Sequence, residues 1–247
     1  MEAYLEIAKD VAIKVKKKLI NKNSNNLNVL NNKDKDIKLS ADILSHNYIV
    51  DELTKTNIPV FSEEGNNNTF NLNNYQWIVD PLDGTLNYSR GFKISAISIS
   101  LWDNGKPLLG VIVPLFYDDI YYSLKGFGAW KNNKKINVSK IKSKEEAILA
   151  TGFPSGRNYD EESLMKTLKN IREFKKVRMI GSAVTMLSLV ANGVFDIYEE
   201  EDIYIWDVAA GLSLVEEAGG CFSIIEASNH FKYNVKASNK FLSNEKI

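Results

Sequence analysis

The sequence predicts a mixed α/β fold of layered sheets and helices. From about residue 77 to residue 130, short β-rich runs follow one another with turns such as 103–107 between them, which indicates an antiparallel meander. After about residue 143 the pattern changes to alternating strands and helices. No Pro-rich linker separates the two regions. We therefore expect one domain over residues 1–247, with an antiparallel-sheet half at about 1–142 and a βα half at about 143–247.

Two helices are expected before the meander. Residues 2–21 carry apolar side chains at helical spacing, with lysines on the opposite face. A second helical pattern opens at 40–42. Between them, residues 22–36 are rich in Asn, Lys and Asp and are expected to form a loop. The apolar run 58–61 is expected to be a short strand, and the Asn-rich segment 65–75 a polar loop.

The second half of the chain is expected to contain, in order, strand 147–151, helix 160–174, strand 177–179, helix 182–192, strand 194–198 and helix 206–218. Gly219-Gly220 is typical of the end of a helix. Cys221 follows directly, and we expect it to begin a buried strand as a small hydrophobic residue.

Composition and charge exclude several classes of protein. The chain has 31 basic and 31 acidic residues among 247, so no overall electrostatic field attracts nucleic acid or an anionic membrane. The single cysteine excludes an intrachain disulfide framework. No signal peptide is visible, and no apolar run approaches the roughly 20 residues of a membrane helix. We expect a cytoplasmic protein with a small-molecule ligand and with no nucleic-acid or membrane partner.

The most informative motif lies at the end of an apolar strand. Trp77-Ile78-Val79 runs into Asp80-Pro81-Leu82-Asp83-Gly84-Thr85. Pro81 fixes its own φ, and Gly84 permits a sharp turn. Such a turn can aim both carboxylates and the Leu82 carbonyl at one point, and hard oxygen ligands of this kind suit Mg²⁺. The alternative is an ordinary surface turn, because Asp, Pro and Gly are common in turns.

Other carboxylates allow both a functional and a purely structural interpretation. Asp42 is either a site residue or a helix N-cap, and Glu63-Glu64 is either part of a site or a solvated loop edge. Asp207 lies inside an apolar stretch, where a lone carboxylate is costly without a partner. We interpret it as a helix N-cap, a ligand, or both. The acidic run 199–202 is expected to be mostly solvated. Two histidines are interpreted as structural: His46 and His230.

Four motifs, in this order, resemble those of the inositol monophosphatase family, within the lithium-sensitive, Mg²⁺-dependent phosphatase superfamily. They are Asp36…Ser40-Ala41-Asp42, Glu63-Glu64, Asp80-Pro81-Leu82-Asp83-Gly84-Thr85, and Trp206-Asp207-Val208-Ala209-Ala210-Gly211 followed by Glu216-Glu217-Ala218-Gly219-Gly220. The resemblance covers most of the chain, from about Lys33 to Gly220. It implies an αβαβα sandwich, a homodimer, and an active site that binds two or three Mg²⁺ ions.

The resemblance also implies a role for individual residues. The implied metal ligands are Glu63, Asp80, the Leu82 carbonyl, Asp83 and Asp207. The implied catalytic residues are Asp42, Glu63 and Thr85, of which Asp42 and Thr85 would orient the nucleophilic water. The implied substrate-binding residues are Asp83, Gly84, Thr85, Ser182, Ala183, Glu200 and Asp207. Glu200 matches the family position that binds a substrate hydroxyl.

The implied activity is hydrolysis of a small phosphate monoester by a metal-activated water, with inositol monophosphate or a related sugar phosphate as substrate. Ser62-Glu63-Glu64 is more typical of the 3′(2′),5′-bisphosphate nucleotidase branch, whereas Leu86-Asn87 and residues 150–154 favour the inositol phosphatase branch. Fructose 1,6-bisphosphate is a further alternative substrate. A phosphatase-like scaffold that binds a partner without catalysis is the alternative of another class, and the intact set of carboxylates argues against it.

Overall fold

The protein is described from a computed structural model that covers residues 1–21, 29–33, 36–65, 70–153, 159–227 and 231–243. Its helices are α1 (Glu2–Asn21), α2 (Ser40–Leu53), α3 (Thr85–Ser89), α4 (Glu161–Ile171), α5 (Ala183–Ala191), α6 (Ala209–Glu217) and α7 (Lys240–Ser243), with 3₁₀ turns η2 (Thr54–Thr56) and η3 (Ile205–Asp207). Its strands are β1 (Val29–Lys33), β2 (Asp36–Leu39), β3 (Val60–Ser62), β4 (Gln76–Asp83), β5 (Ala96–Asp103), β6 (Lys106–Pro114), β7 (Tyr121–Leu124), β8 (Gly128–Lys131), β9 (Lys134–Ile136), β10 (Ile148–Ala150), β11 (Lys176–Arg178), β12 (Ile197–Tyr204), β13 (Cys221–Glu226) and β14 (Lys232–Ser238).

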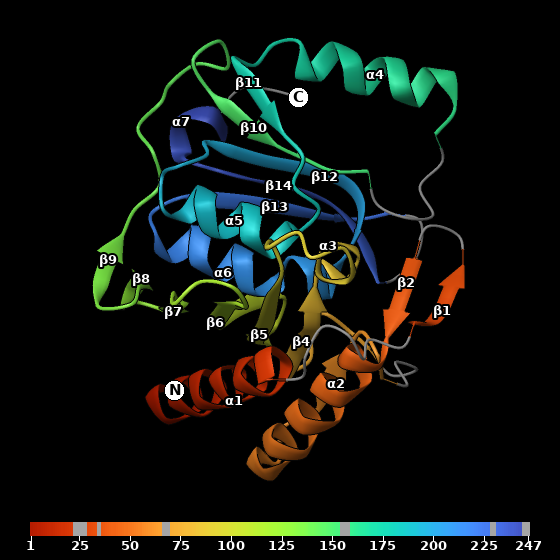
Figure 1. The fold of residues 1–247 in the computed structure, drawn as a ribbon. Helices are drawn as coiled ribbons and strands as arrows, with labels where there is room; N and C mark the ends of the chain where they lie inside the picture. Colours follow the sequence, from red (N-terminus) through yellow and green to blue (C-terminus); the bar gives the residue numbers. More distant parts are fainter. Residues whose placement is uncertain (22–28, 34–35, 66–69, 154–158, 228–230, 244–247) are drawn as a thin grey trace.

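Five layers of helices and sheets build the fold (Figure 1). Helices α1 and α2 cover the outer face of a seven-stranded sheet, and α5 and α6 lie between that sheet and a five-stranded sheet. Helices α4 and α7 lie on the far side of the second sheet. This arrangement confirms the predicted αβαβα sandwich.

The two sheets differ in topology. The first has the strand order β3-β4-β5-β6-β7-β8-β9, and all its pairs are antiparallel except β3 with β4. The predicted meander is therefore confirmed. The second sheet has the order β11-β10-β12-β14-β13, with β10 parallel to both of its neighbours and β14 antiparallel to β12 and β13.

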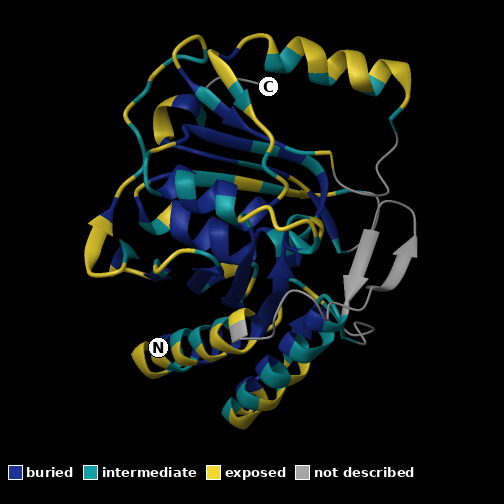
Figure 2. Ribbon diagram, in the orientation of Figure 1, coloured by how far each residue is buried: buried dark blue, intermediate teal, exposed yellow. Residues whose placement is uncertain are grey.

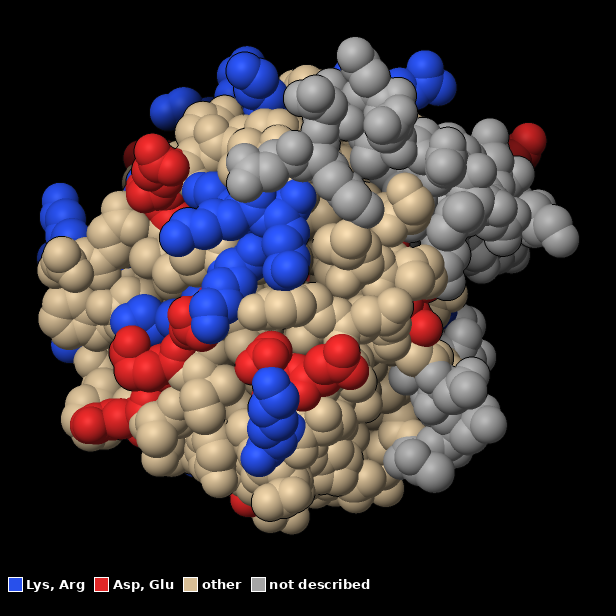
Figure 3. All heavy atoms as spheres, turned by 60° about the horizontal axis from the view of Figure 1, so that its bottom comes forward, with Lys and Arg blue, Asp and Glu red and all other residues tan. Residues whose placement is uncertain are grey.

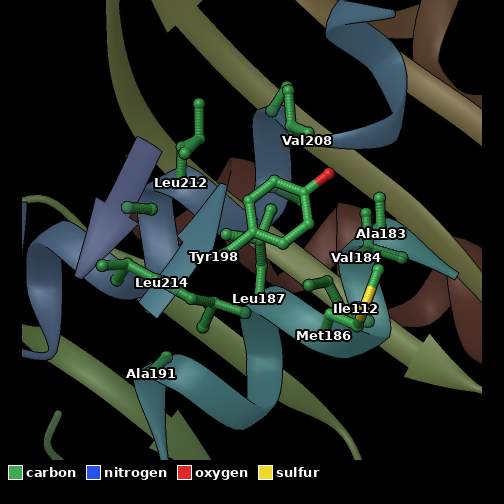
Figure 4. Close-up of a cluster of buried hydrophobic side chains, with 14 of the residues drawn as sticks. Ile112, Ala183, Val184, Met186, Leu187, Ala191, Tyr198, Val208, Leu212 and Leu214 are labelled. Carbon is green, nitrogen blue, oxygen red and sulfur yellow. The ribbon is translucent and has the colours of Figure 1, made fainter. Parts of the chain in front are cut away.

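The middle layer holds the largest core. Helices α5 and α6 are apolar on almost all sides, so they are stable only when both sheets cover them. Small residues allow this close packing, because a Cβ on Gly211 would lie 2.4 Å from the side chain of Leu187. Figure 4 shows part of this cluster, with the ring of Tyr198 inside it and its hydroxyl at one edge. Figure 2 shows that buried residues concentrate in this layer and in both sheets.

Acidic and basic side chains share the surface seen in Figure 3, where a band of Lys and Arg is flanked by Asp and Glu. Along α1, Lys9 pairs with Glu6 at 2.8 Å and Lys14 pairs with Asp10 at 2.6 Å. These mixed charges agree with the zero net charge of the chain. Within the described ranges, no helix is long and apolar enough to span a membrane.

The expected loop over residues 22–36 is wrong where the structure describes this segment. Strands β1 and β2 pair there as a two-stranded antiparallel sheet. The two apolar residues of β1 are adjacent and do not alternate, and the alternation in β2 covers only four residues, so neither segment gives a clear strand signal. Residues 22–28 and 34–35 lie outside the described ranges, as do residues 66–69 of the second expected loop and His230.

The acidic run 199–202 is not mostly solvated, because β12 extends to Tyr204 and carries it through the sheet. Glu200 and Asp202 are each only 7% exposed. Asp202 pairs with Lys232 at 3.2 Å, and the Tyr198 hydroxyl donates a 2.8 Å hydrogen bond to Glu200. Partners on β14 and on β12 itself therefore compensate for the burial of both carboxylates.

Two smaller expectations also differ from the structure. Cys221 begins strand β13 as expected, but it is partly exposed because β13 lies at the edge of its sheet. The helix expected over 206–218 is divided into the turn η3 and helix α6, with Val208 between them.

Candidate active site

The 80–85 motif lies at the buried end of β4. Asp80 is 1% exposed and Asp83 is 7% exposed, so the surface-turn alternative is wrong. The register between β4 and β5 shifts between these two residues, and such a bulge re-aims side chains. The Leu82 N–H donates a 2.9 Å hydrogen bond to Asp80 Oδ1, which folds the turn back toward its first carboxylate.

Gly84 makes the sharp turn from β4 into α3. Its φ of +82° is in the left-handed region, where a side chain is strained. A Cβ at this position would also lie 2.9 Å from the Ile94 carbonyl oxygen and 3.2 Å from that of Gly181. The turn therefore leads from the two carboxylates directly into α3, which begins at Thr85.

Four carboxylates from three parts of the fold influence one another electrostatically at this turn. Burial raises the pKa of Asp80 well above its usual range, and the negative charges of Glu63, Asp83 and Asp207 raise it further. A concentration of acidic oxygens in a buried place is the donor set that a hard divalent cation requires. In the described ranges no three acidic, His or Cys side chains form a ready metal centre, so a bound ion would have to draw these carboxylates closer.

Asp83 is held by the N-terminal end of helix α5. The Ser182 hydroxyl and the Val184 N–H, the latter at 3.2 Å, both donate to Asp83 Oδ2. Burial raises the pKa of Asp83 to about 6, although these donors and the Ala183 and Gly84 amides act in the opposite direction. Asp83 thus connects the first sheet to a helix of the middle layer.

Asp42 and Thr85 form a second contact across the site. The Thr85 hydroxyl lies 3.2 Å from Asp42 Oδ1 and 3.0 Å from the Leu82 carbonyl oxygen. Asp42 is 4% exposed and is the third residue of α2, which begins at Ser40. Its position inside the first turn excludes the N-cap alternative.

Glu63 and Asp207 come from opposite sheets. Glu63 follows β3 and its N–H donates a 3.2 Å hydrogen bond to the Val79 carbonyl, which ties it to β4. Glu63 lies in a turn and is partly buried. Asp207 ends η3, and the residue that precedes α6 is Val208, so Asp207 is not the N-cap of that helix.

Glu200 occupies a separate position beside this group of carboxylates. Its Oε2 accepts a hydrogen bond from the buried Tyr198 hydroxyl. Burial raises the pKa of Tyr198 well above its usual range, and the charges of Glu200, Asp207 and Asp83 add to this effect. A Cβ on Gly152 would lie 2.7 Å from Glu200 Oε1, so a glycine leaves room for the carboxylate there.

Three residues around the site were not predicted to be site residues: Asn87 and Gly152, which served only to favour one branch of the family, and Tyr198. Tyr198 was detectable in principle, because it lies two residues before Glu200 on the same strand and therefore on the same face of the sheet. Asn87 and Gly152 make contacts with residues far away in the sequence, which no local pattern reveals.

The αβαβα sandwich and the acidic side chains around the buried Asp-Pro-Leu-Asp-Gly-Thr turn are those of a family of phosphatases, that is, of phosphoric monoester hydrolases. The sequence model of the inositol monophosphatase family matches residues 1–246, and the chain belongs to this family. The family depends on a metal ion, generally Mg²⁺.

Three known proteins illustrate the relationship. The fructose-1,6-bisphosphatase/inositol-1-monophosphatase of Aquifex aeolicus is 37% identical over 61% of this chain and 58% of its own length, so the match spans less than two thirds of that relative. The Nus factor SuhB of Xylella fastidiosa is 36% identical over 78% of this chain and 71% of its own. The crystal structure of the suppressor protein SuhB from Bartonella henselae has a TM-score of 0.86, at 30% identity over 97% of this chain and 95% of that one.

Proposed function

We propose that this protein hydrolyses a small phosphate monoester of a polyol, inositol monophosphate or a related sugar phosphate, with Mg²⁺ as its metal. The observation that carries the proposal is the buried turn with Asp80 and Asp83, where the negative charges of Glu63, Asp83 and Asp207 act on Asp80. Glu63, Asp80, the Leu82 carbonyl, Asp83 and Asp207 would hold two or three ions. When bound, Mg²⁺ would neutralise phosphate charge and lower the pKa of an attacking water.

Thr85 and Asp42 would orient that water. The Thr85 hydroxyl has one proton and two acceptors in reach, the Asp42 carboxylate at 3.2 Å and the Leu82 carbonyl at 3.0 Å. When its proton is donated to either of these acceptors, the Thr85 oxygen can accept a hydrogen bond from water. A proton that leaves the water can then pass through Thr85 Oγ1 to Asp42, while Glu63 acts beside them as a further acceptor.

The substrate would lie between the two sheets. The backbone amides of Gly84 and Thr85, at the start of α3, would bind the phosphate. Ser182 and Ala183, at the start of α5, would line the opposite wall together with Asp83 and Asp207. Glu200, which Tyr198 orients at 2.8 Å, would accept hydrogen bonds from polyol hydroxyls. A carboxylate at this place disfavours a second phosphate, since like charges repel.

The fold weakens the argument for a bisphosphate nucleotidase. Ser62 was the residue that favoured it, yet the Ser62 side chain is buried and its hydroxyl lies 2.9 Å from His46 Nδ1. This contact inside the fold accounts for Ser62 without any contact to substrate. It also supports a structural role for His46. Fructose 1,6-bisphosphate stays an alternative because the Aquifex relative carries that activity in its name.

We further propose that the chain acts as a single domain in the cytoplasm and forms a homodimer. Helix α4 supports the dimer, because Asn170 faces the fold and donates a 2.7 Å hydrogen bond to Glu199, while Leu164, Met165 and Leu168 face outward. Leu168 is 54% exposed. An apolar helix face of this kind is typical of an interface between subunits. Analytical ultracentrifugation of the wild type and a Leu168→Lys variant tests it, and a wild-type monomer at all concentrations would refute it.

A substrate panel tests the main proposal. Phosphate release is measured from inositol 1-phosphate, fructose 1,6-bisphosphate, 3′-phosphoadenosine 5′-phosphate and p-nitrophenyl phosphate, in MgCl₂ and in EDTA. The Asp83→Asn variant should lose most activity, whereas Asp118→Asn is the matched control because Asp118 is fully exposed and pairs only loosely with Lys16 at 3.7 Å. A folded wild type that releases no phosphate from any of the four compounds would support the non-catalytic scaffold instead.

A further inference from the structure

One side-chain amide connects the two halves of the site. Asn87 lies on α3, and its Nδ2 donates to the carbonyl oxygens of Ile94 at 2.9 Å, Ile180 at 2.8 Å and Gly181 at 3.1 Å. Ile94 precedes β5 of the first sheet, whereas Ile180 and Gly181 form the loop between β11 and α5. A single amide group on α3 therefore binds two other backbone segments at once, the one before β5 and the loop before α5.

The backbone packs closely around the Asn87 side chain, and two glycines make this close approach possible. Gly181 has a φ of +68°, and a Cβ on it would lie 3.2 Å from both polar atoms of the Asn87 side chain. On the opposite side, a Cβ on Gly84 would lie 3.2 Å from the Gly181 carbonyl oxygen. The two glycines thus let the 84–87 turn and the 180–181 loop pack against each other with Asn87 between them.

The loop that Asn87 holds leads directly into the residues that bind Asp83. Ser182 follows Gly181, and its hydroxyl donates to Asp83 Oδ2, as does the N–H of Val184 at 3.2 Å. Asp83 itself precedes the turn that carries Asn87. The contacts form a closed ring in which Asp83 is held by α5 and the start of α5 is held by Asn87.

We propose that Asn87 is a positioning residue whose amide holds the start of α5 against the 80–85 turn and thereby keeps Asp83 in place for a divalent cation. The inference rests on the proposed function, in which Asp83 is a metal ligand. Only a donor can serve three carbonyl oxygens. An aspartate side chain would present acceptor oxygens to these carbonyl oxygens. A leucine side chain, of similar size, would present no hydrogen-bond donor to them.

The test compares Asn87→Asp and Asn87→Leu with Ser89→Ala. Ser89 is the matched control because its hydroxyl donates only to Leu86 within the same helix, at 2.8 Å, and does not reach the loop. Mg²⁺ binding is measured by calorimetric titration without substrate, and hydrogen exchange of the amides of residues 181–185 is measured without metal. For both Asn87 variants we expect Mg²⁺ affinity to fall by about 10- to 100-fold, the usual effect of losing an outer-shell partner.

Amide exchange in residues 181–185 should accelerate at least about tenfold in these variants, because their hydrogen bonds open more often. Ser89→Ala should stay within about twofold of the wild type in both measurements.

Folded Asn87 variants with wild-type Mg²⁺ affinity and wild-type exchange would overturn the inference. If Asn87→Leu does not fold, Asn87→Gln replaces it, and the same losses are expected because its donors lie one methylene further out. A wild type that binds no Mg²⁺ would refute the proposed function instead, while the exchange data would still decide whether Asn87 holds the loop.

Discussion

Replacing Asp83 by Asn should stabilise the metal-free protein at alkaline pH while it destroys activity. Burial raises the pKa of Asp83 from 3.8 to about 6, so the folded state resists ionisation of this group. A rise of this size corresponds to about 3 kcal/mol of unfolding free energy once Asp83 is ionised in both states. Asn keeps the shape and can still accept from Ser182 and Val184, but it carries no charge.

The pH dependence of the stability gain follows from the difference in proton binding by Asp83 between the folded and unfolded states. Below pH 3.8 the carboxyl group is protonated in both folded and unfolded chains, and no penalty exists. The folded state holds this proton more tightly than the unfolded state, and this tighter binding favours folding. As the pH rises through about 6 the proton is lost, and the contribution of proton binding to stability disappears. The stability advantage of the Asp83→Asn variant should therefore be small at pH 4 and largest above pH 7. We expect a net gain of about 1–3 kcal/mol there, because neutral hydrogen bonds replace stronger charged ones.

Urea unfolding in EDTA at pH 4.5 and pH 8, followed by circular dichroism, measures the effect in wild type and Asp83→Asn. Phosphate release in MgCl₂ gives activity on the same samples. A variant that is less stable than wild type at pH 8, or equally stabilised at both pH values, would refute the reasoning that burial of an ionised Asp83 costs stability. Near-normal turnover by the variant would refute its role as a metal ligand.

Further predictions concern the water, the substrate, the turn and inhibition. Thr85→Val removes the hydroxyl between water and Asp42, and kcat should fall by about 100-fold or more with little change in the melting temperature, whereas an unchanged kcat would exclude the proposed proton path. Glu200→Ala should weaken kcat/KM for inositol 1-phosphate by about 1–3 kcal/mol and change p-nitrophenyl phosphate hydrolysis far less, because the latter has no hydroxyl to bind; equal losses would contradict a hydroxyl contact. Gly84→Ala places a Cβ 2.9 Å from the Ile94 carbonyl at a φ of +82°, so unfolding free energy should fall by about 1–3 kcal/mol in thermal denaturation, and wild-type stability would mean that the turn relaxes freely. LiCl should inhibit phosphate release uncompetitively, with KCl as the control for ionic strength, and identical responses to the two salts would oppose the expected lithium sensitivity.

Most elements of the fold follow from local patterns. Apolar periodicity placed α1, α2, α5 and the meander, because each of these buries one face or all faces against a neighbour. The errors fall where stability comes from long-range pairing. β1 and β2 are short and give only a weak local signal for a strand, and β12 carries two buried carboxylates whose partners include Lys232 on another strand. No window of neighbouring residues contains that information.

The sequence by itself determined the chemistry of this protein: which carboxylates, which hydroxyl and which turn-forming glycine are present, and in what order. Those are properties of residue types and short spacings, so they are readable without a fold. Only the tertiary structure decided how the pieces meet. It brought Asp42 to Thr85 across 43 residues and Asn87 to Ile180 across 93. It also buried Glu200 against Tyr198 instead of leaving it in solvent. Such contacts depend on how two sheets pack around α5 and α6, and packing is a property of the whole chain.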